Sequence, residues 1–203
     1  MASINLAKRA LRKEVKKKIA ALTSKEKFHQ SHLVANKIIK SELLKNSERI
    51  SIYVSTDEEI NTTTIMEAIF NLGKTCFIPR YSFDKIHMDM VKLHSMDDLE
   101  RLPLTKWNIK QPSLMEAREN ALDTGGLDLI FIPGLAFTKD GKRLGRGKAF
   151  YDTYLGQCCE KQAKPPIKVG LAFAEQIFED IPTDDHDIVL DHVVSCDSVS
   201  NDL

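Results

Sequence analysis

Short runs of apolar and β-branched residues alternate along this chain with stretches whose apolar residues recur at helical spacing. Residues 49–54 (RISIYV) and 75–78 (TCFI) predict two strands, and Pro79 is expected to close the second. Between them, Ile65 and Ile69 lie on one side of a predicted helix. A strand, a helix and a strand in this order are typical of a parallel crossover. The repeated alternation favours a parallel sheet with helices on both faces.

The same alternation continues toward both ends of the chain. Further strands are predicted at residues 88–93, 127–132, 167–173 and 188–194. Near the beginning, Leu11, Val15 and Ile19 form the apolar stripe of a helix. A second helix begins at a capping box made by Thr23 and Glu26. Its buried face is predicted to contain Phe28, Ala35, Ile38 and Ile39, and its end to fall at residues 45–47.

Together these elements predict a three-layer α/β/α sandwich around a mostly parallel, Rossmann-like sheet with N-terminal helices, in a single domain over residues 1–203. In such folds ligands bind beyond the carboxyl ends of the strands. Three loops follow predicted strands at that edge, at residues 55–61, 79–81 and 133–148. We therefore expect the functional site to be built from these loops.

Overall charge excludes some classes of protein. The chain of 203 residues has 29 Lys and Arg against 29 Asp and Glu, so its formal net charge is zero. A general nucleic-acid-binding protein carries a basic excess, so this class is excluded. No apolar run approaches the length of a membrane span. The four cysteines lack the spacing of a disulfide framework, which predicts reduced thiols and a cytoplasmic protein. The basic N-terminus also suits a mitochondrial targeting segment.

The zero net charge is a sum of separated patches. Residues 1–18 contain seven Lys and Arg and one Glu, and residues 139–148 contain five and one Asp. Residues 175–191 contain seven Asp and Glu and no Lys or Arg. Clustered cations suit phosphate groups, and carboxylates suit Mg²⁺. Overall neutrality therefore still allows a concentrated anion site.

The strongest functional motif is residues 142–148 (KRLGRGK), which place four cations and two glycines between a predicted strand and a predicted helix. Glycine lets the backbone approach a ligand closely, and a helix start offers free N–H groups with a partial positive charge. These properties predict a phosphate cradle, and the competing interpretation is a solvated basic turn. The motif is not a Walker A loop, because Arg146 stands where that motif has glycine and Ala149 follows Lys148. Phe150 stands where a dinucleotide-binding fingerprint has its third glycine.

Three other groups of side chains fit the same chemistry. Lys8 and Arg12, four residues apart, lie on one side of the first helix, where an anion or solvent would offset their repulsion. Asp152 follows the basic loop and is a candidate Mg²⁺ ligand. An acidic cluster around His186 supplies other candidate ligands or turn residues: Asp180, Asp184, Asp185, Asp187 and Asp191. Four aromatic residues can stack on a heterocycle or pack in the core: Tyr81, Trp107, Phe150 and Tyr151. The residues alone thus predict an Mg²⁺-dependent enzyme acting on a nucleotide or another phosphate ligand.

In combination these segments resemble the 5-formyltetrahydrofolate cyclo-ligase (methenyltetrahydrofolate synthetase) family, from Lys8 to about Val194. The block RLGRGKAFYD at residues 143–152, followed by HD and LD within residues 186–191, is highly specific in combination. Other segments that carry the resemblance are KRALR at 8–12, residues 50–60, FIPRY at 77–81, WNI at 107–109, GLDLI at 126–130 and PGLAF at 133–137.

The resemblance implies an ATP-driven ring closure in which ATP and 5-formyltetrahydrofolate give 5,10-methenyltetrahydrofolate, ADP and phosphate, with Mg²⁺. It also implies a monomeric ligase of one-carbon metabolism that acts on small molecules, without nucleic-acid or membrane partners. Arg146 and Lys148 would be catalytic, because they would neutralise the transferring phosphoryl group. Asp152 and Asp187 would hold Mg²⁺, directly or through water.

The resemblance also implies two overlapping binding sites. The ATP site would comprise Lys8, Arg9, Ala10, Leu11 and Arg12 together with Arg143, Leu144, Gly145, Arg146, Gly147, Lys148, Ala149, Phe150 and Tyr151. The folate site would comprise Val54, Glu59, Tyr81 and Trp107 together with Arg146, Gly147, Lys148, Ala149 and Phe150.

One short segment departs from the family, which usually reads Gly-Tyr-Tyr-Asp where this chain has residues 149–152 (AFYD). Ala149 adds a methyl group, and Phe150 keeps the ring but lacks a hydroxyl worth about 1 kcal/mol if it bonds the folate. The departure leaves a non-catalytic folate- or nucleotide-binding protein on the same scaffold as an alternative. An enzyme related to sugar-phosphate isomerases would need no ATP, and a kinase would release a stable phosphorylated product.

Overall fold

A six-stranded, mostly parallel sheet forms the centre of the computed structural model, which describes residues 2–82, 87–184 and 186–197. The strands lie in the order β3-β2-β1-β4-β7-β9, and only β3 runs antiparallel to its neighbour. Their bounds are β1 Arg49–Ser51, β2 Thr75–Ser82, β3 His87–Leu93, β4 Leu129–Ile132, β7 Ile167–Leu171 and β9 His192–Val194. This arrangement confirms the predicted sheet.

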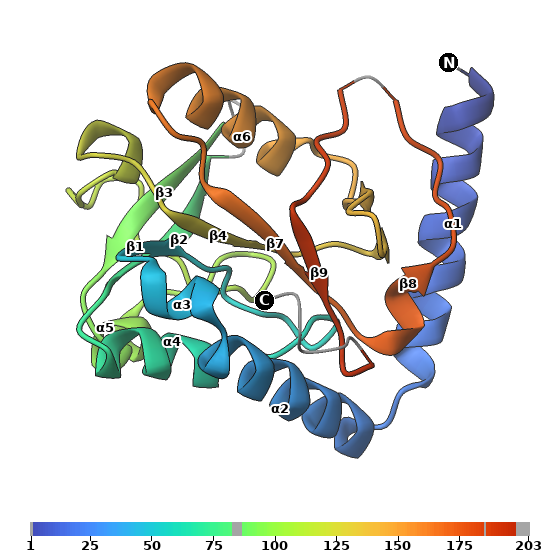
Figure 1. Ribbon diagram of the computed structural model, residues 1–203, viewed down its shortest axis with the longest axis horizontal. Helices are drawn as coiled ribbons and strands as arrows, with labels where there is room; N and C mark the ends of the chain where they lie inside the picture. The colour runs from blue at the N-terminus through green and yellow to red at the C-terminus, as the bar shows by residue number, and fades with distance from the viewer. Residues whose placement is uncertain (1, 83–86, 185, 198–203) are drawn as a thin grey trace.

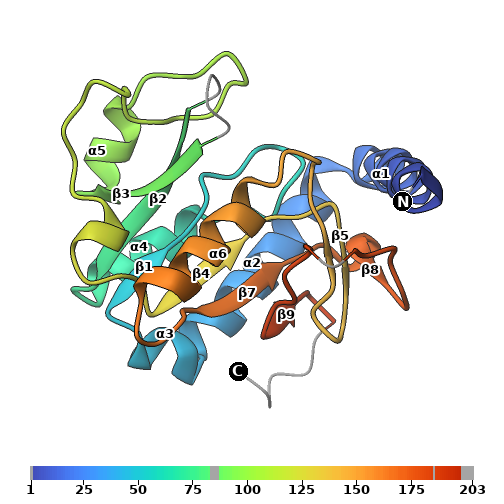
Figure 2. The same ribbon diagram turned by 90° about the horizontal axis from the view of Figure 1, so that it is seen from above.

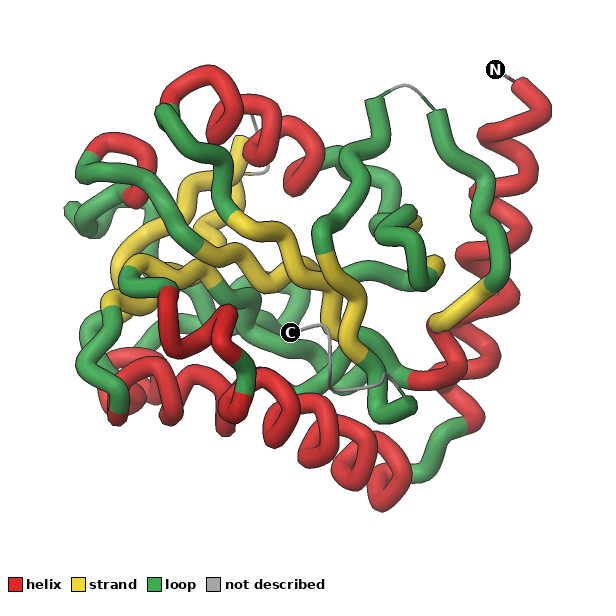
Figure 3. Tube along the Cα trace, viewed as in Figure 1, coloured by secondary structure: helices red, strands yellow, loops and turns green. Residues whose placement is uncertain are grey.

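Helices cover both faces of this sheet (Figure 1). On one face lie α2 (Ser24–Lys40), α3 (Glu42–Asn46) and α4 (Thr63–Asn71), with α5 (Met96–Arg101) nearby, and on the other lies α6 (Phe150–Lys161). The alternation of side chains along β4 explains the layering. Leu129 and Phe131 pack in the apolar cluster of α2 and α4, whereas Ile130 and Ile132 pack in the cluster of α6. The predicted three-layer α/β/α sandwich is therefore confirmed, and Figure 3 shows the sheet between its helices.

Helix α1 (Ala2–Ala21) lies at the edge of the molecule, beside the strand β8 (Ile177–Phe178) (Figures 1 and 2). Its stripe is anchored by Val15 and Ile19, which are buried. The capping box at the start of α2 is present, because the Thr23 hydroxyl accepts from Glu26 N–H and the Glu26 carboxylate accepts from Thr23 N–H. Both N-terminal helices are thus confirmed.

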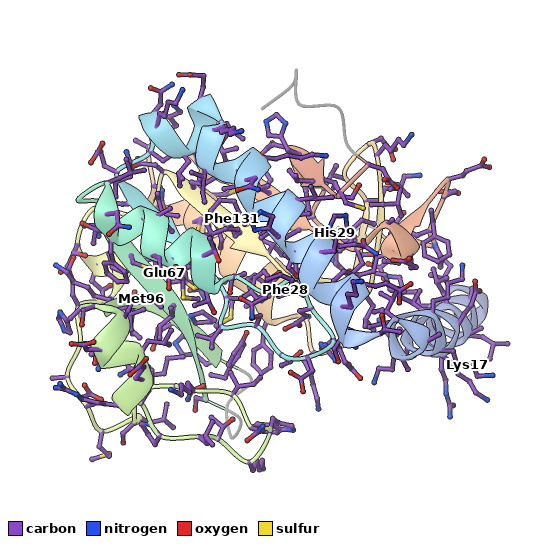
Figure 4. The ribbon with its side chains drawn as sticks, turned by 90° about the horizontal axis from the view of Figure 1, so that it is seen from below. Lys17, Phe28, His29, Glu67, Met96 and Phe131 are labelled. Carbon is purple, nitrogen blue, oxygen red and sulfur yellow. The ribbon has the colours of Figure 1, made fainter. Side chains whose placement is uncertain are left out.

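The expected buried face and end of α2 were wrong in two details. Phe28 is 75% exposed and stacks on His32, with ring centroids 6.4 Å apart. The buried stripe runs instead through Gln30, Val34 and Ile38, at a spacing of four, and Phe28 lies off this stripe. Figure 4 labels Phe28 and His29 on α2 and Phe131 in the sheet. The helix also ends at Lys40, and Ser41 separates it from α3 by ending one helix and capping the next.

Pro79 does not close the second strand, contrary to the sequence-based expectation. β2 continues through Pro79 to Ser82 and pairs with β3 along its whole length. The ladder between β2 and β1 ends at Phe77, so Pro79 lies where no strand on that side needs its missing N–H. β1 is correspondingly shorter than predicted, because regular pairing stops at Ser51.

A second, three-stranded sheet was not predicted. It consists of β5 (Ala136–Thr138), β6 (Arg143–Leu144) and β8, in the order β6-β5-β8. Pairing of β5 with β6 makes the first part of the basic loop a hairpin. All four cysteines are free thiols, as expected. Within the described ranges, no helix is both long and apolar enough to cross a membrane.

Candidate functional site

The sheet has a topological switch point between β1 and β4. The chain moves from β1 to β2 in one direction along the sheet and from β4 to β7 and β9 in the other. The loops that leave the carboxyl ends of two such neighbouring strands separate and form a crevice, where ligands bind in this class of fold. Here these are residues 52–62 after β1 and residues 133–149 after β4. Two of the three loops expected from the sequence thus meet at this point.

Arg146 joins these two loops across the switch point. Its guanidinium donates to Glu58 Oε2 at 2.9 Å and to Glu59 Oε1 at 3.2 Å. Burial by itself would lower the pKa of Arg146, but the two carboxylates outweigh it and raise the pKa. The Glu59 side chain is only 9% exposed and also accepts from the backbone N–H and hydroxyl of Thr56. A permanent cation and a fixed carboxylate therefore lie side by side at the crevice.

Arg143 connects the basic hairpin to α6. It is buried and donates through one nitrogen to both carboxylate oxygens of Asp152, at 2.9 and 2.8 Å. Its other terminal nitrogen donates to the carbonyl of Pro133. A Cβ at Gly145 would lie 2.8 Å from this guanidinium, so glycine is required for the approach. The hairpin is thereby held against the first turn of the helix.

The N-terminal helix reaches the same region through Lys8 and Arg12. Lys8 is 6% exposed, and its ammonium lies 2.7 Å from Asp184 Oδ2 and 2.5 Å from Asp187 Oδ2. Burial lowers the pKa of Lys8, but the two carboxylates raise it by more. Arg12 Nε donates to the carbonyl of Gly145 at 2.9 Å. The pair predicted to share one side of the helix does so, and that side faces the basic loop.

The two predicted Mg²⁺ ligands lie next to each other in space. The backbone N–H of Ile188, which follows Asp187, donates to Asp152 Oδ1 at 3.3 Å. Both carboxylates are paired with cations, Asp152 with Arg143 and Asp187 with Lys8. Among the described residues, no group of three or more His, Cys, Asp or Glu is placed to hold a metal ion. Mg²⁺ is often held by one or two carboxylates with waters and substrate phosphates, so this donor pair fits such an ion.

Aromatic side chains line the β2 side of the crevice. The rings of Tyr81 and Phe150 meet edge to face, with centroids 5.1 Å apart. Gln111 accepts from the Tyr81 N–H and donates to the Tyr81 carbonyl, which attaches the long loop after α5 to β2. Trp107 lies in that loop, is 45% exposed and has the Lys106 ammonium 4.6 Å from its ring centroid. Trp107 is therefore linked to the crevice through its loop.

Lys148 and Ala149 form the start of α6. Lys148 is exposed and makes no hydrogen bond or ion pair with any residue that the structure describes. Ala149 has φ 53° and ψ 15°, the left-handed conformation that disfavours a side chain. This conformation gives a physical reason for the glycine that the family usually has here, since glycine adopts it at little cost. The missing glycine affects the backbone itself.

Some predicted residues do not face the crevice. Arg9 and Ala10 are exposed on α1, whereas Leu11 packs against the core, as does Val54. Leu144 is also buried in the core. Of the four cations in residues 142–148, Lys142 pairs with Asp180 on the surface at 2.7 Å. Protein carboxylates thus neutralise three of these cations, which answers the repulsion that favoured a bound anion.

Three residues of the site were missed as functional candidates. Glu58 pairs with Arg146, Asp184 shares Lys8 with Asp187, and Gln111 holds Tyr81. Asp184 had been noted in the acidic cluster, and Glu58 stands beside Glu59 in the expected loop. No local pattern marks Gln111, because its partner lies on a distant strand.

Comparison with known proteins gives a consistent result over almost the whole chain. The model of the 5-formyltetrahydrofolate cyclo-ligase family matches residues 4–196. The chain is 51% identical over 196 residues to the 5-formyltetrahydrofolate cyclo-ligase of Mus musculus, with 97% of each chain covered. It is 36% identical to a probable 5-formyltetrahydrofolate cyclo-ligase of Caenorhabditis elegans, covering 96% of this chain and 95% of the other. The solved structure of 5,10-methenyltetrahydrofolate synthetase from Aquifex aeolicus superimposes with a TM-score of 0.75 at 27% identity, covering 94% of this chain and 90% of that one.

Proposed function

Because the chain belongs to the 5-formyltetrahydrofolate cyclo-ligase family, we propose that it converts 5-formyltetrahydrofolate to 5,10-methenyltetrahydrofolate at the switch-point crevice, using ATP and Mg²⁺. The observation that carries the assignment to this crevice is the meeting of the two loops at Arg146. This contact places a cation suited to phosphate beside a carboxylate and aromatic rings suited to a heterocycle.

The proposed chemistry has two steps. The formyl oxygen attacks the γ-phosphorus of ATP, a new O–P bond forms and ADP leaves. N10 of the folate then attacks the formyl carbon, the new C–N bond closes the ring, and the original formyl oxygen leaves with the phosphate. Phosphoryl transfer demands positioning and neutralisation of charge more than covalent participation by the protein. The crevice therefore needs cations on its phosphate side and a rigid holder on its folate side.

On the phosphate side, Arg146 and Lys148 would neutralise the transferring group. Lys148 has no competing partner among the described residues and stands at the start of α6, where backbone N–H groups and the helix dipole also favour an anion. Arg146 is held by carboxylates only, so it can exchange Glu58 for a phosphate without breaking any backbone contact. Lys8, Arg12 and Arg143 would form the more distant part of the ATP site.

On the folate side, Glu59, Tyr81 and Phe150 would position the pterin, and Trp107 would wall its entrance. Asp152 and Asp187 would hold Mg²⁺ with waters and phosphate oxygens, and the bound ion would supply further neutralisation of phosphate charge. Lys8 and Arg143 already hold these carboxylates in place. Their position between the acidic residues and the basic hairpin supports a shared ATP–metal region.

The decisive experiment follows product formation by absorbance. Purified protein mixed with ATP, Mg²⁺ and 5-formyltetrahydrofolate should develop the near-ultraviolet band of the methenyl product, while releasing ADP and phosphate. Omitting ATP should abolish the band. Absence of the band where the same assay works for a control cyclo-ligase would refute the proposal. A stable phosphorylated product would instead indicate a kinase, and turnover without ATP would indicate isomerase-like chemistry.

A further inference from the structure

Three tyrosines surround Glu59 on the folate side of the crevice. Tyr53 follows β1, Tyr81 belongs to β2 and Tyr151 belongs to the first turn of α6. Burial raises the pKa of all three phenols, and the charge of Glu59 raises each pKa further. The phenols of Tyr81 and Tyr151 also interact with each other. We call Tyr53, Tyr81 and Tyr151 the phenol cluster.

Within the phenol cluster, the Tyr151 hydroxyl differs from that of Tyr53. Tyr53 donates to the carbonyl of Ile60 at 3.2 Å, so its hydroxyl is used by the fold. Tyr151 is 6% exposed, and its oxygen has no hydrogen-bond partner of good geometry among the described residues. A buried hydroxyl without a good hydrogen bond costs free energy. Such a group suggests a position that a ligand completes.

The surroundings of Tyr151 indicate which ligand this is. Its hydroxyl is grouped with Tyr81 and Glu59, two residues expected to contact folate, while Arg143 lies 5.8 Å from its ring centroid. The neighbouring Phe150 packs on Tyr81 and has no hydroxyl of its own. A hydroxyl is therefore available on the folate side from Tyr151, although the family resemblance implied that this residue contacts ATP.

We propose that the Tyr151 hydroxyl donates a hydrogen bond to an oxygen of the folate substrate and thereby positions it. The inference rests on the proposed function of this crevice. The raised pKa of Tyr151 keeps the phenol protonated at neutral pH, so it acts as a donor. Acceptors of the required kind are the carbonyl oxygens of the reduced pterin and of the formyl group.

The test compares Tyr151→Phe with Tyr154→Phe. Tyr154 lies one turn along α6, is 2% exposed and also has a hydroxyl without a well-formed hydrogen bond, but it faces Cys158 and Asp89 outside the phenol cluster. Calorimetry without the second substrate measures the affinity for 5-formyltetrahydrofolate and, separately, for a non-hydrolysable ATP analogue. We expect Tyr151→Phe to weaken folate binding about threefold to tenfold, the worth of one hydrogen bond. Its affinity for the ATP analogue should stay within twofold (~0.4 kcal/mol) of wild type.

Steady-state kinetics should agree, with a raised KM for folate and an unchanged KM for ATP. Tyr154→Phe should match wild type in both affinities. Unchanged folate affinity in Tyr151→Phe, or a loss confined to the ATP analogue, would overturn the inference. Thermal melting monitors folding: the change removes one oxygen atom that lacks a good partner, so the melting temperature should not fall. Failure of the proposed function would appear separately, as absence of the methenyl band in wild-type protein.

Discussion

The two ends of the parallel strands both carry many charged residues, but these residues are bonded in different ways. At the amino end, Arg49 donates to the carbonyl of Gly126 and to Thr124 as well as to Glu119. At the carboxyl end, Lys8 and Arg146 contact carboxylates only, and Lys148 has no partner in the described part of the chain. The view in Figure 2 separates these two ends of the sheet.

This difference distinguishes charges that maintain the fold from charges that a ligand can use. A cation that also bonds backbone carbonyls cannot leave its position without exposing them, which costs free energy. A cation held by side-chain carboxylates alone can exchange one anion for another. The charged residues of the amino end should therefore affect stability, and those of the carboxyl end should affect activity.

The largest expected effect is on activity, from Lys148→Ala at the carboxyl end. Removal of this cation from the phosphate side should lower kcat by about 10²- to 10³-fold, as is typical when one stabilising group is lost. The melting temperature should not change, because Lys148 has no partner in the described part of the chain. Lys139→Ala, a nearby exposed lysine of the same loop, is the control and should retain activity. Equal turnover in the two variants would contradict the proposed role of Lys148.

A large effect on stability is expected from Arg118→Ala near the amino end. Arg118 is buried, with 4% of its side chain exposed, and donates to Asp98 through two nitrogens and to the carbonyl of Lys92. Breaking such a buried pair should lower the free energy of unfolding by about 3 kcal/mol. Urea unfolding measures this loss, and KM for both substrates should stay the same. A change in KM without a loss of stability would remove the distinction between the two ends.

A moderate, pH-dependent effect is expected from Glu119. Hydrogen bonds from Lys92 first, and from Thr124, lower its pKa from 4.5 to about 2. A carboxylate whose pKa is depressed by folding stabilises the protein above its unfolded pKa, and this contribution disappears as pH falls from about 4.5 to about 2. Unfolding free energies at pH 6 and pH 3 should differ less in Glu119→Gln than in wild type, by about 1 kcal/mol after solvent screening. An identical pH dependence would show that Glu119 contributes nothing to acid stability.

The smallest effect is expected from Ala149→Gly, back at the carboxyl end. The variant removes a side chain from a left-handed position, and glycine entropy offsets part of the gain. Unfolding should become harder by about 0.5–1 kcal/mol, with a matching rise in melting temperature. Gly73→Ala provides the reverse change, since Gly73 has φ 71° and open space around it, and this variant should melt earlier. A lower melting temperature for Ala149→Gly would be inconsistent with strain at this position.

Local patterns predicted the elements of the fold better than their limits. The capping box of Thr23 and Glu26 and the apolar stripe of α1 depend on neighbours in sequence, and both are present. The strand at Pro79 and the exposure of Phe28 depend on which elements lie alongside, so composition misjudged them. The hairpin of β5 and β6 also escaped prediction, because its strands are too short to show a pattern.

The site shows a similar division. The basic loop, Lys8, Arg12 and Asp187 could all be picked out from residue type and spacing, and the structure brings them together. Their pairing could not be predicted, because Arg146 and Glu58 are 88 residues apart in the sequence. Lys8 and Asp187 had been assigned to different ligands, whereas here they bond each other. The sequence names the groups, and only the fold decides their partners.

The contact between Lys8 and Asp184 spans 176 residues of sequence. During synthesis the first helix emerges early, but its partner carboxylates are added near the end. The helix must therefore remain undocked, with its apolar stripe and cations exposed, until almost all of the chain has left the ribosome. The phosphate side of the crevice is then among the last parts of the molecule to assemble, so an incomplete chain cannot form it.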